Sequence, residues 1–137
     1  MTILTILLAA IGSLLVLFLR PIQGLAVYCI LSMWYPYSVA TLKVGTIDFS
    51  VGRIVIVVLF LKLLFSTNLV AKFRTVWLDR LVVILFAAEI AAGLTTTDAM
   101  RLIEYRSGDF FDMALPYFAV RLIVTDRKKF ISLVKTL

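Results

Sequence analysis

The sequence begins with "MTILTILLAAIGSLLVLFL", residues 1–19, which contains no charged side chain. A second uncharged run follows after a single arginine, because residues 21–42 also lack Asp, Glu, Lys and Arg. A transmembrane helix needs about 20 consecutive, mostly apolar residues to cross the hydrocarbon core of a bilayer. The two runs therefore predict membrane-spanning helices in the first third of the chain.

The composition of the whole chain points in the same direction. Of the 137 residues, 63% are hydrophobic and only 16% are charged, and the mean hydropathy is +1.09. Soluble domains are about half apolar and about a quarter charged, and a small domain leaves much of its surface in water. Lipid, rather than water, is therefore the expected solvent for most of these side chains.

Prolines, glycines and clusters of charge divide the chain into apolar segments. We expect these segments at 3–19, 22–42, 49–65, 81–94 and 110–125, with the start of a sixth at 130–137. They predict an all-α fold, a polytopic transmembrane helical bundle of about five spans plus an incomplete sixth. The last segment is too short to span, so residues 1–137 are expected to form one transmembrane region, the truncated N-terminal part of a larger membrane protein.

The basic residues predict an orientation. If every segment spans, one side of the membrane holds Arg20, Lys72, Arg74, Arg80, Arg127, Lys128 and Lys129, and the other holds Lys43, Arg101 and Arg106. The richer side is expected in the cytoplasm, which places the N-terminus outside. If the first two segments do not both span, the N-terminus moves inside. The excess of Lys and Arg on the cytoplasmic side explains the net charge of +6, and no nucleic-acid partner is expected.

Three charged residues fall inside the apolar segments. Arg53 and Lys62 lie toward the ends of segment 49–65, where long side chains can reach the headgroups. Glu89 lies about 13 Å into segment 81–94 and is too short to do so. Small residues surround it, so we expect this segment to pack closely on 49–65 with Glu89 paired to Arg53 or Lys62. A purely structural pair and a part in substrate or proton handling both stay open.

The segment "GDFFDMALPYFAVRLIVTDRKK", residues 108–129, carries polar groups that need an explanation by position. Asp109 is expected to cap a helix whose first turn holds Asp112. Pro116 removes the hydrogen bond to the Asp112 carbonyl and predicts a kink. Arg121, in the last turn, is expected to reach toward lipid headgroups.

Searches for the known chemical motifs find none. The sequence has no phosphate-binding glycine loop, no nucleophile elbow and no metal-ligand spacing. It has no histidine and a single cysteine, Cys29, so no intramolecular disulfide is expected. The residues by themselves predict no catalytic, cofactor-binding or metal site.

Three stretches resemble the bacterial O-antigen ligase/polymerase-like family: "RPIQGLAVYCILSMWYP" (20–36), "GTIDFSVGRIVIVVLFLKLL" (45–64) and "SGDFFDMALPYFAVRLIVTDRKKF" (107–130). The whole chain is similar to the N-terminal quarter to third of that family. The resemblance implies a polysaccharide-biosynthesis glycosyltransferase of the bacterial inner (cytoplasmic) membrane. Such proteins move glycan from a polyprenyl-diphosphate carrier to an acceptor, such as lipid A core, another glycan repeat or a protein, without nucleotide sugar or metal.

The same resemblance limits what this chain can do. The key Arg and His residues of the family lie in and around a large periplasmic loop, which this sequence does not contain. The chain alone is therefore expected to be inactive. By analogy, Arg53, or Arg101 and Arg106, are candidates for holding the diphosphate on the outer side.

A second reading stays open beside this one. Half of a membrane transporter or flippase, or a small structural membrane subunit, has a similar composition. In that case the proline-broken segments and Glu89 line a substrate path.

Overall fold

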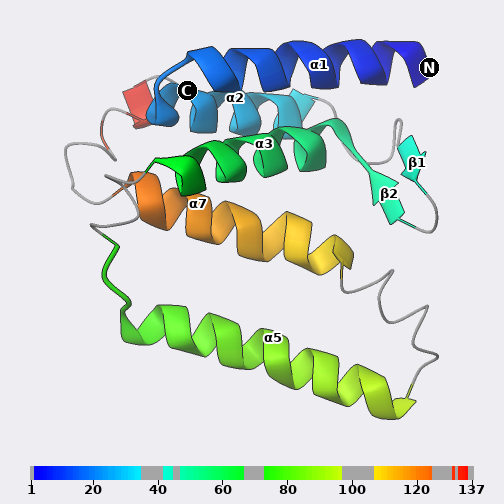
Figure 1. Cartoon of the computed structure of the whole chain (residues 1–137), viewed down its shortest axis with the longest axis vertical. Coiled ribbons are helices and arrows are strands. Elements are labelled where there is room, and N and C mark those ends of the chain that lie inside the picture. The colour runs from blue at the N-terminus through cyan, green and yellow to red at the C-terminus, as the bar shows by residue number, and fades with distance from the viewer. Residues whose placement is uncertain are drawn as a thin grey trace.

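The computed structural model describes residues 2–34, 42–44, 47–66, 73–96, 107–124, 131 and 133–135. The elements are α1 (Thr2–Phe18), α2 (Pro21–Trp34), β1 (Leu42–Val44), β2 (Ile47–Phe49), α3 (Val51–Phe65), α5 (Trp77–Thr96), the π-helix η1 (Phe110–Ala114) and α7 (Leu115–Ile123). Figure 1 shows α1, α2, α3 and α7 as neighbouring layers, with α5 beyond α7.

Short polar signals set the boundaries of the first helices. Pro21 is the first residue of α2, a position where its missing N–H costs nothing. The side chain of Gln23 accepts a hydrogen bond from the N–H of Arg20 at 3.3 Å, which is one half of a capping box. Ser50 caps α3, because its hydroxyl accepts from the N–H of Arg53. The chain therefore turns sharply between α1 and α2. The backbone N–H groups of Arg20 and Arg53 both have hydrogen-bond acceptors.

The core lies where α1, α2 and α3 pack together. Gly12 of α1 allows the closest approach, since a Cβ there would lie 2.6 Å from Leu31 Cδ1 and 2.9 Å from Val55 Cγ2. Small residues let helix backbones come this close. The buried side chains of α3, which include Val51, Val55, Ile56, Leu59 and Leu63, fill the centre of the unit. α7 then covers another side of α3.

α5 is different, because none of its residues belongs to the buried hydrophobic core of the described part. Its leucine and isoleucine side chains are exposed from Leu78 to Leu94, and Val82 is half-buried. A ring contact joins it to η1, with the centroids of Phe86 and Phe110 6.3 Å apart. Its first turn is held by a polar cluster that is described below.

The predicted transmembrane bundle is wrong, because no helix in the described part of the chain is both long and apolar enough to cross a membrane. α1, α2 and α3 have 17, 14 and 15 residues, fewer than the ~20 that a span needs. α5 has 20 residues but carries Asp79, Arg80 and Glu89. Each of these helices is therefore shorter or more charged than a membrane span allows.

The chain between the second and third apolar segments forms an antiparallel hairpin that was not predicted. β1 pairs with β2 in the register Leu42↔Phe49, Lys43↔Asp48 and Val44↔Ile47. The signal was present, since "LKV" and "IDF" both alternate apolar and charged residues with period two. In the second segment, predicted to end at residue 42, the structure describes α2 up to Trp34 and places Leu42 in β1, while residues 35–41 lie outside the described part.

Candidate functional site

The charged residues inside the apolar helices are the candidate site, and the first of them is Arg53. It lies in the first turn of α3 and is only 8% exposed. Its Nε donates to Asp112 Oδ1 at 2.9 Å, and its Nη2 donates to Asp112 Oδ2 at 2.5 Å. This is a bidentate guanidinium–carboxylate pair, the geometry in which such pairs are strongest. It joins α3 to η1.

The π-helix places Asp112 opposite Arg53. The N–H of Leu115 donates to the carbonyl of Phe110, the five-residue spacing of a π-turn. Pro116 follows directly, and in an α-helix its ring would press on the carbonyl of Asp112. We infer that the wider turn accommodates the proline without ending the helix.

The predicted cap at Asp109 is wrong. This residue is itself helical, with φ −59° and ψ −38°, and its side chain makes no capping hydrogen bond. Residues 107 and 108 before it are already helical. Asp112 thus has a specific partner, Arg53, in addition to its place near a helix N-terminus.

Two glycines and two hydroxyl groups surround this pair. A Cβ on Gly108 would lie 3.1 Å from Arg53 Nη2, and one on Gly52 would lie 2.9 Å from the hydroxyl of Ser32. Burial is the main reason that the pKa of Tyr28 is raised; the charge of Asp112 raises it further, and a hydrogen bond with Ser32 partly opposes this. Tyr28 therefore stays protonated at neutral pH.

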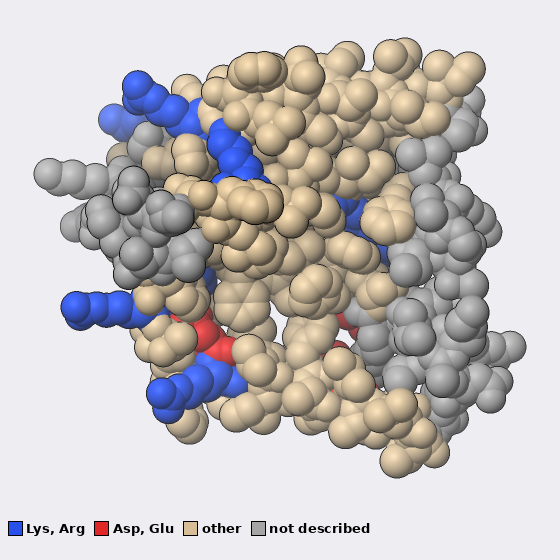
Figure 2. Space-filling view, viewed as in Figure 1, with Lys and Arg blue, Asp and Glu red and all other residues tan. Residues whose placement is uncertain are grey.

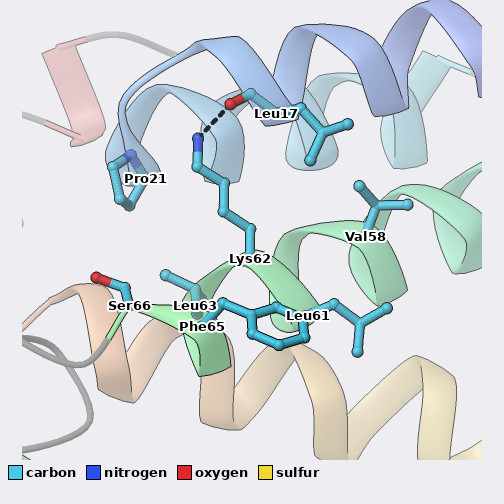
Figure 3. A pocket seen from close by; sticks show the side chains of 8 residues that line it. All are labelled: Leu17, Pro21, Val58, Leu61, Lys62, Leu63, Phe65 and Ser66. Carbon is cyan, nitrogen blue, oxygen red and sulfur yellow. Dashed lines mark hydrogen bonds between the residues drawn. The ribbon is translucent and has the colours of Figure 1, made fainter.

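Lys62, near the other end of α3, also has internal partners. Its Nζ donates to the backbone carbonyls of Val16, Leu17 and Leu19 at 2.8, 2.9 and 2.5 Å. Figure 3 shows the side chain extending from α3 to the end of α1. The last carbonyls of a helix lack partners within the helix, and a cation there also meets the negative end of the helix dipole. Lys62 therefore caps α1 from a neighbouring helix, with all three of its donors used.

An apolar pocket lies beside this cap. Its volume is about 620 Å³, within the usual range of small-molecule sites. It is lined by Leu17, Pro21, Val58, Leu61, Lys62, Leu63, Phe65 and Ser66 (Figure 3). These walls fit an alkyl chain, and the ammonium group of Lys62 is engaged with carbonyls rather than directed at a ligand.

The third charged group joins α5 to α7 through Asp79, which is only 3% exposed. Arg121 donates from Nε to Oδ1 and from Nη2 to Oδ2, both at 3.1 Å. The hydroxyl of Tyr117 donates to Oδ1 at 2.7 Å, and the N–H of Val76 donates to Oδ2 at 2.8 Å. We call these residues, Val76, Asp79, Tyr117 and Arg121, the Asp79 cluster.

The electrostatics of the Asp79 cluster favour the ionised carboxylate. Hydrogen bonds from Arg121 hold the pKa of Asp79 well below its usual range, although burial acts in the opposite direction. The same contact raises the pKa of Arg121. Burial, followed by the hydrogen bond to Asp79, raises the pKa of Tyr117. The cluster is a fixed ion pair with a neutral phenol, an arrangement suited to holding helices together.

Arg121 is also held away from the predicted lipid headgroups. Its Nη2 donates to the carbonyl of Arg74 at 3.2 Å, and its guanidinium carbon lies 5.8 Å from the ring centroid of Phe73. The chain before α5 therefore folds over Arg121, and the expected outward reach of this side chain is replaced by internal contacts.

The predicted packing around Glu89 is wrong. α7, not α5, packs against α3 (Figure 1), and Arg53 and Lys62 bind the partners given above. The small residues expected at that interface, Ala87, Ala88, Ala91 and Ala92, are exposed, and Glu89 is half-buried on α5. Arg101 and Arg106 lie outside the described residues, so their predicted role in diphosphate binding stays a prediction.

Sequence reasoning missed Asp79 and Tyr117. The available signal was the position of Asp79, three residues after Val76 at the start of an apolar run, which is typical of a side chain that reaches back to cap a helix. Among the described residues, no group of three or more His, Cys, Asp or Glu residues is placed to hold a metal ion.

Comparisons with known proteins give no relative: no protein-family model, no curated protein and no solved structure matches the chain.

Proposed function

We propose that this chain is the lipid-embedded N-terminal portion of a bacterial O-antigen ligase/polymerase-like glycosyltransferase of the inner membrane. The complete protein would transfer glycan from a polyprenyl-diphosphate carrier to an acceptor. This portion would supply helical scaffold, and alone it would be inactive. Its partners would be membrane lipid and the polyprenyl-diphosphate-linked glycan.

The observation that supports lipid contact is the distribution of charge and aliphatic surface. Arg53, Lys62, Asp79 and Arg121 have internal partners, while large apolar side chains on α1, α3 and α5 point outward. Phe18 and Phe65 are 83% and 84% exposed, and Figure 2 shows uncharged surface running along α1 and α5. Contiguous apolar patches of this kind are rare on proteins in water. The proposal requires contact with acyl chains and does not require any one helix to cross the bilayer.

The glycan-transfer part of the proposal is supported by where the family-like stretches fall. Stretch 45–64 carries Arg53 and Lys62, and stretch 107–130 carries Asp112 and Arg121. These are the side chains that join α3 to η1, α3 to α1 and α7 to α5. The resemblance therefore covers both partners of the Arg53–Asp112 pair and one partner of each of the other two contacts.

The structure refines the role of Arg53 within this proposal. A diphosphate would have to compete with Asp112, which already occupies the guanidinium in a bidentate pair. Arg53 is therefore better suited to positioning η1. Arg101 and Arg106 remain the candidates for contact with the diphosphate.

Photocrosslinking in native membranes tests the proposal. A polyprenyl-diphosphate glycan that carries a photoreactive group is expected to label this chain, and unlabelled polyprenyl diphosphate should compete while an equal excess of phospholipid should not. Absence of labelling, or equal competition by phospholipid, would refute donor binding. Glycan transfer to an acceptor by residues 1–137 alone would refute the scaffold role.

A further inference from the structure

Charged side chains of the described part are sorted between the two ends of the helices. One end carries the C-terminus of α1, the N-terminus of α2, the C-termini of α3 and α7 and the N-terminus of α5 (Figure 1). We call it the basic end; its Lys and Arg residues in the described part are Arg20, Lys62, Arg74, Arg80, Arg121 and Lys135. Figure 2 shows most of the basic side chains gathered there. At the opposite end of the described part, Arg53 is accompanied by Asp109 and Asp112, and the hairpin sets Lys43 in register with Asp48.

Only some of these cations are directed outward. Lys62 and Arg121 are engaged with backbone carbonyls and with Asp79. Arg20, Arg74 and Arg80 are exposed, and none of them forms an ion pair with a described acidic residue. Within the described residues, Arg20, Arg74 and Arg80 therefore present positive charge that no acidic side chain neutralises.

Apolar surface lies directly beside this charge. The pocket next to the α1 cap opens at this end, with Pro21 following Arg20 in the chain. Trp77, three residues from both Arg74 and Arg80, is 69% exposed. A nucleic acid or an acidic peptide would use the cations but not the alkyl-lined pocket. A molecule that joins a negative headgroup to an acyl chain matches both features.

We propose that the basic end binds anionic phospholipids, with headgroup phosphates at Arg20, Arg74 and Arg80 and an acyl chain against the adjoining pocket. The inference rests on the lipid embedding proposed above and adds the headgroup chemistry. Each Lys or Arg near an anionic surface strengthens attraction about fivefold. The basic end therefore faces the anionic surface of the membrane, and the opposite end has no comparable headgroup preference.

The two tryptophans report on the two ends separately. Trp77 begins α5 at the basic end, and Trp34 ends α2 at the opposite end, where it is 86% exposed. The variants Trp34→Phe and Trp77→Phe each leave one reporter in the full chain. Both are reconstituted in nanodiscs of phosphatidylcholine and phosphatidylglycerol, with brominated acyl chains on only one lipid at a time. Bromine quenches tryptophan fluorescence on contact.

Trp77 is expected to be quenched several-fold more by brominated phosphatidylglycerol than by brominated phosphatidylcholine at equal mole fraction, and Trp34 equally by both. Arg74→Gln and Arg80→Gln should each lower the preference at Trp77, by at most about fivefold, the two together should abolish it, and 1 M salt should weaken it. Lys43→Gln, in strand β1 near the opposite end, removes the same charge and should leave the preference unchanged.

Other quenching results would contradict one or both proposals. Equal quenching of Trp77 by the two lipids, or a preference that survives both arginine substitutions, overturns the headgroup inference while leaving lipid embedding intact. If neither brominated lipid quenches either tryptophan, lipid embedding fails and the inference fails with it.

Discussion

α3 and α5 are both apolar helices of this chain, yet they are held in different ways. α3 buries Val51, Val55, Ile56, Leu59 and Leu63 against helices that approach closely through glycine. α5 buries no hydrophobic side chain in the described part and is attached by the Asp79 cluster and one ring contact. The comparison teaches that apolar content does not decide whether a helix is core or surface. In the described part, α3 is held by buried apolar packing together with the contacts of Arg53 and Lys62, whereas α5 lacks the buried packing and depends on the Asp79 cluster and the ring contact.

The largest expected effect comes from disturbing shape at the α3 side. Gly12→Leu forces a side chain into the contact with Leu31 and Val55, and overpacking of this kind costs about 3 kcal/mol. Thermal unfolding in detergent should show the loss. Ala88→Leu is the control, because Ala88 on α5 is exposed and its change should stay within about 0.5 kcal/mol. Equal losses in the two variants would remove the distinction between the helices.

The next effect comes from removing charge at the α5 side. Asp79→Asn leaves Arg121 without its carboxylate, at a cost of about 2 kcal/mol, below the figure for fully buried pairs because Arg121 is partly exposed. Amide hydrogen exchange should accelerate in the first turns of α5 and the last turn of α7, and stay slow in α3. Arg80→Gln, on the same helix but exposed, should change little. Faster exchange throughout α1–α3 would contradict the separation.

Acid should act on α5 in the same way. Because the pKa of Asp79 is lowered in the folded chain, its ionised form contributes stability that is fully present above the unfolded value of about 3.9 and is lost as the pH falls further. Exchange in α5 is therefore expected to accelerate below about pH 4, before that in α3. The Asp79→Asn variant should show no such dependence, and an unchanged acid response in this variant would assign the effect to another group.

The smallest effect concerns the cap that α3 provides to α1. Lys62→Met keeps the aliphatic stem but removes the donors to Val16, Leu17 and Leu19, and water can replace part of the loss, so the cost is about 1 kcal/mol. Exchange should rise in the last turn of α1 alone. Lys62→Arg, which retains donors and charge, should recover most of the protection, and a failure to do so would indicate that packing dominates there.

The sequence located the apolar helices but not their contacts. Segments 3–19 and 49–65 nearly coincide with α1 and α3, because Arg20-Pro21 marks the end of the first apolar run and the capping residue Ser50 marks the start of the other. The partners of Arg53 and Arg121 are 59 and 42 residues away, and no local pattern identifies them. The helical rise predicts how far Glu89 lies along its segment. It does not predict which helix packs beside it.

The π-turn is a second feature that the sequence alone does not predict. Pro116 predicts that the regular α-helical hydrogen bonding is interrupted, and a kink is the usual result. The turn before Pro116 is a π-helix, and Asp112 within it binds Arg53 of α3. The sequence could predict that the helix is perturbed there, but not the form that the perturbation takes.

We propose above that the exposed aliphatic surface contacts lipid while the buried charges pair inside the fold. Cysteine accessibility in native membranes is the most direct test of this arrangement. The background is Cys29→Ala, which removes the single cysteine, and the probes are Leu14→Cys on α1, Ile84→Cys on α5 and Arg74→Cys at the basic end, all at exposed positions. With a water-soluble maleimide, the account predicts slow labelling at Leu14→Cys and Ile84→Cys, fast labelling at Arg74→Cys, and fast labelling at all three after denaturation. Labelling of the two helix positions as fast as Arg74→Cys in intact membranes would contradict it.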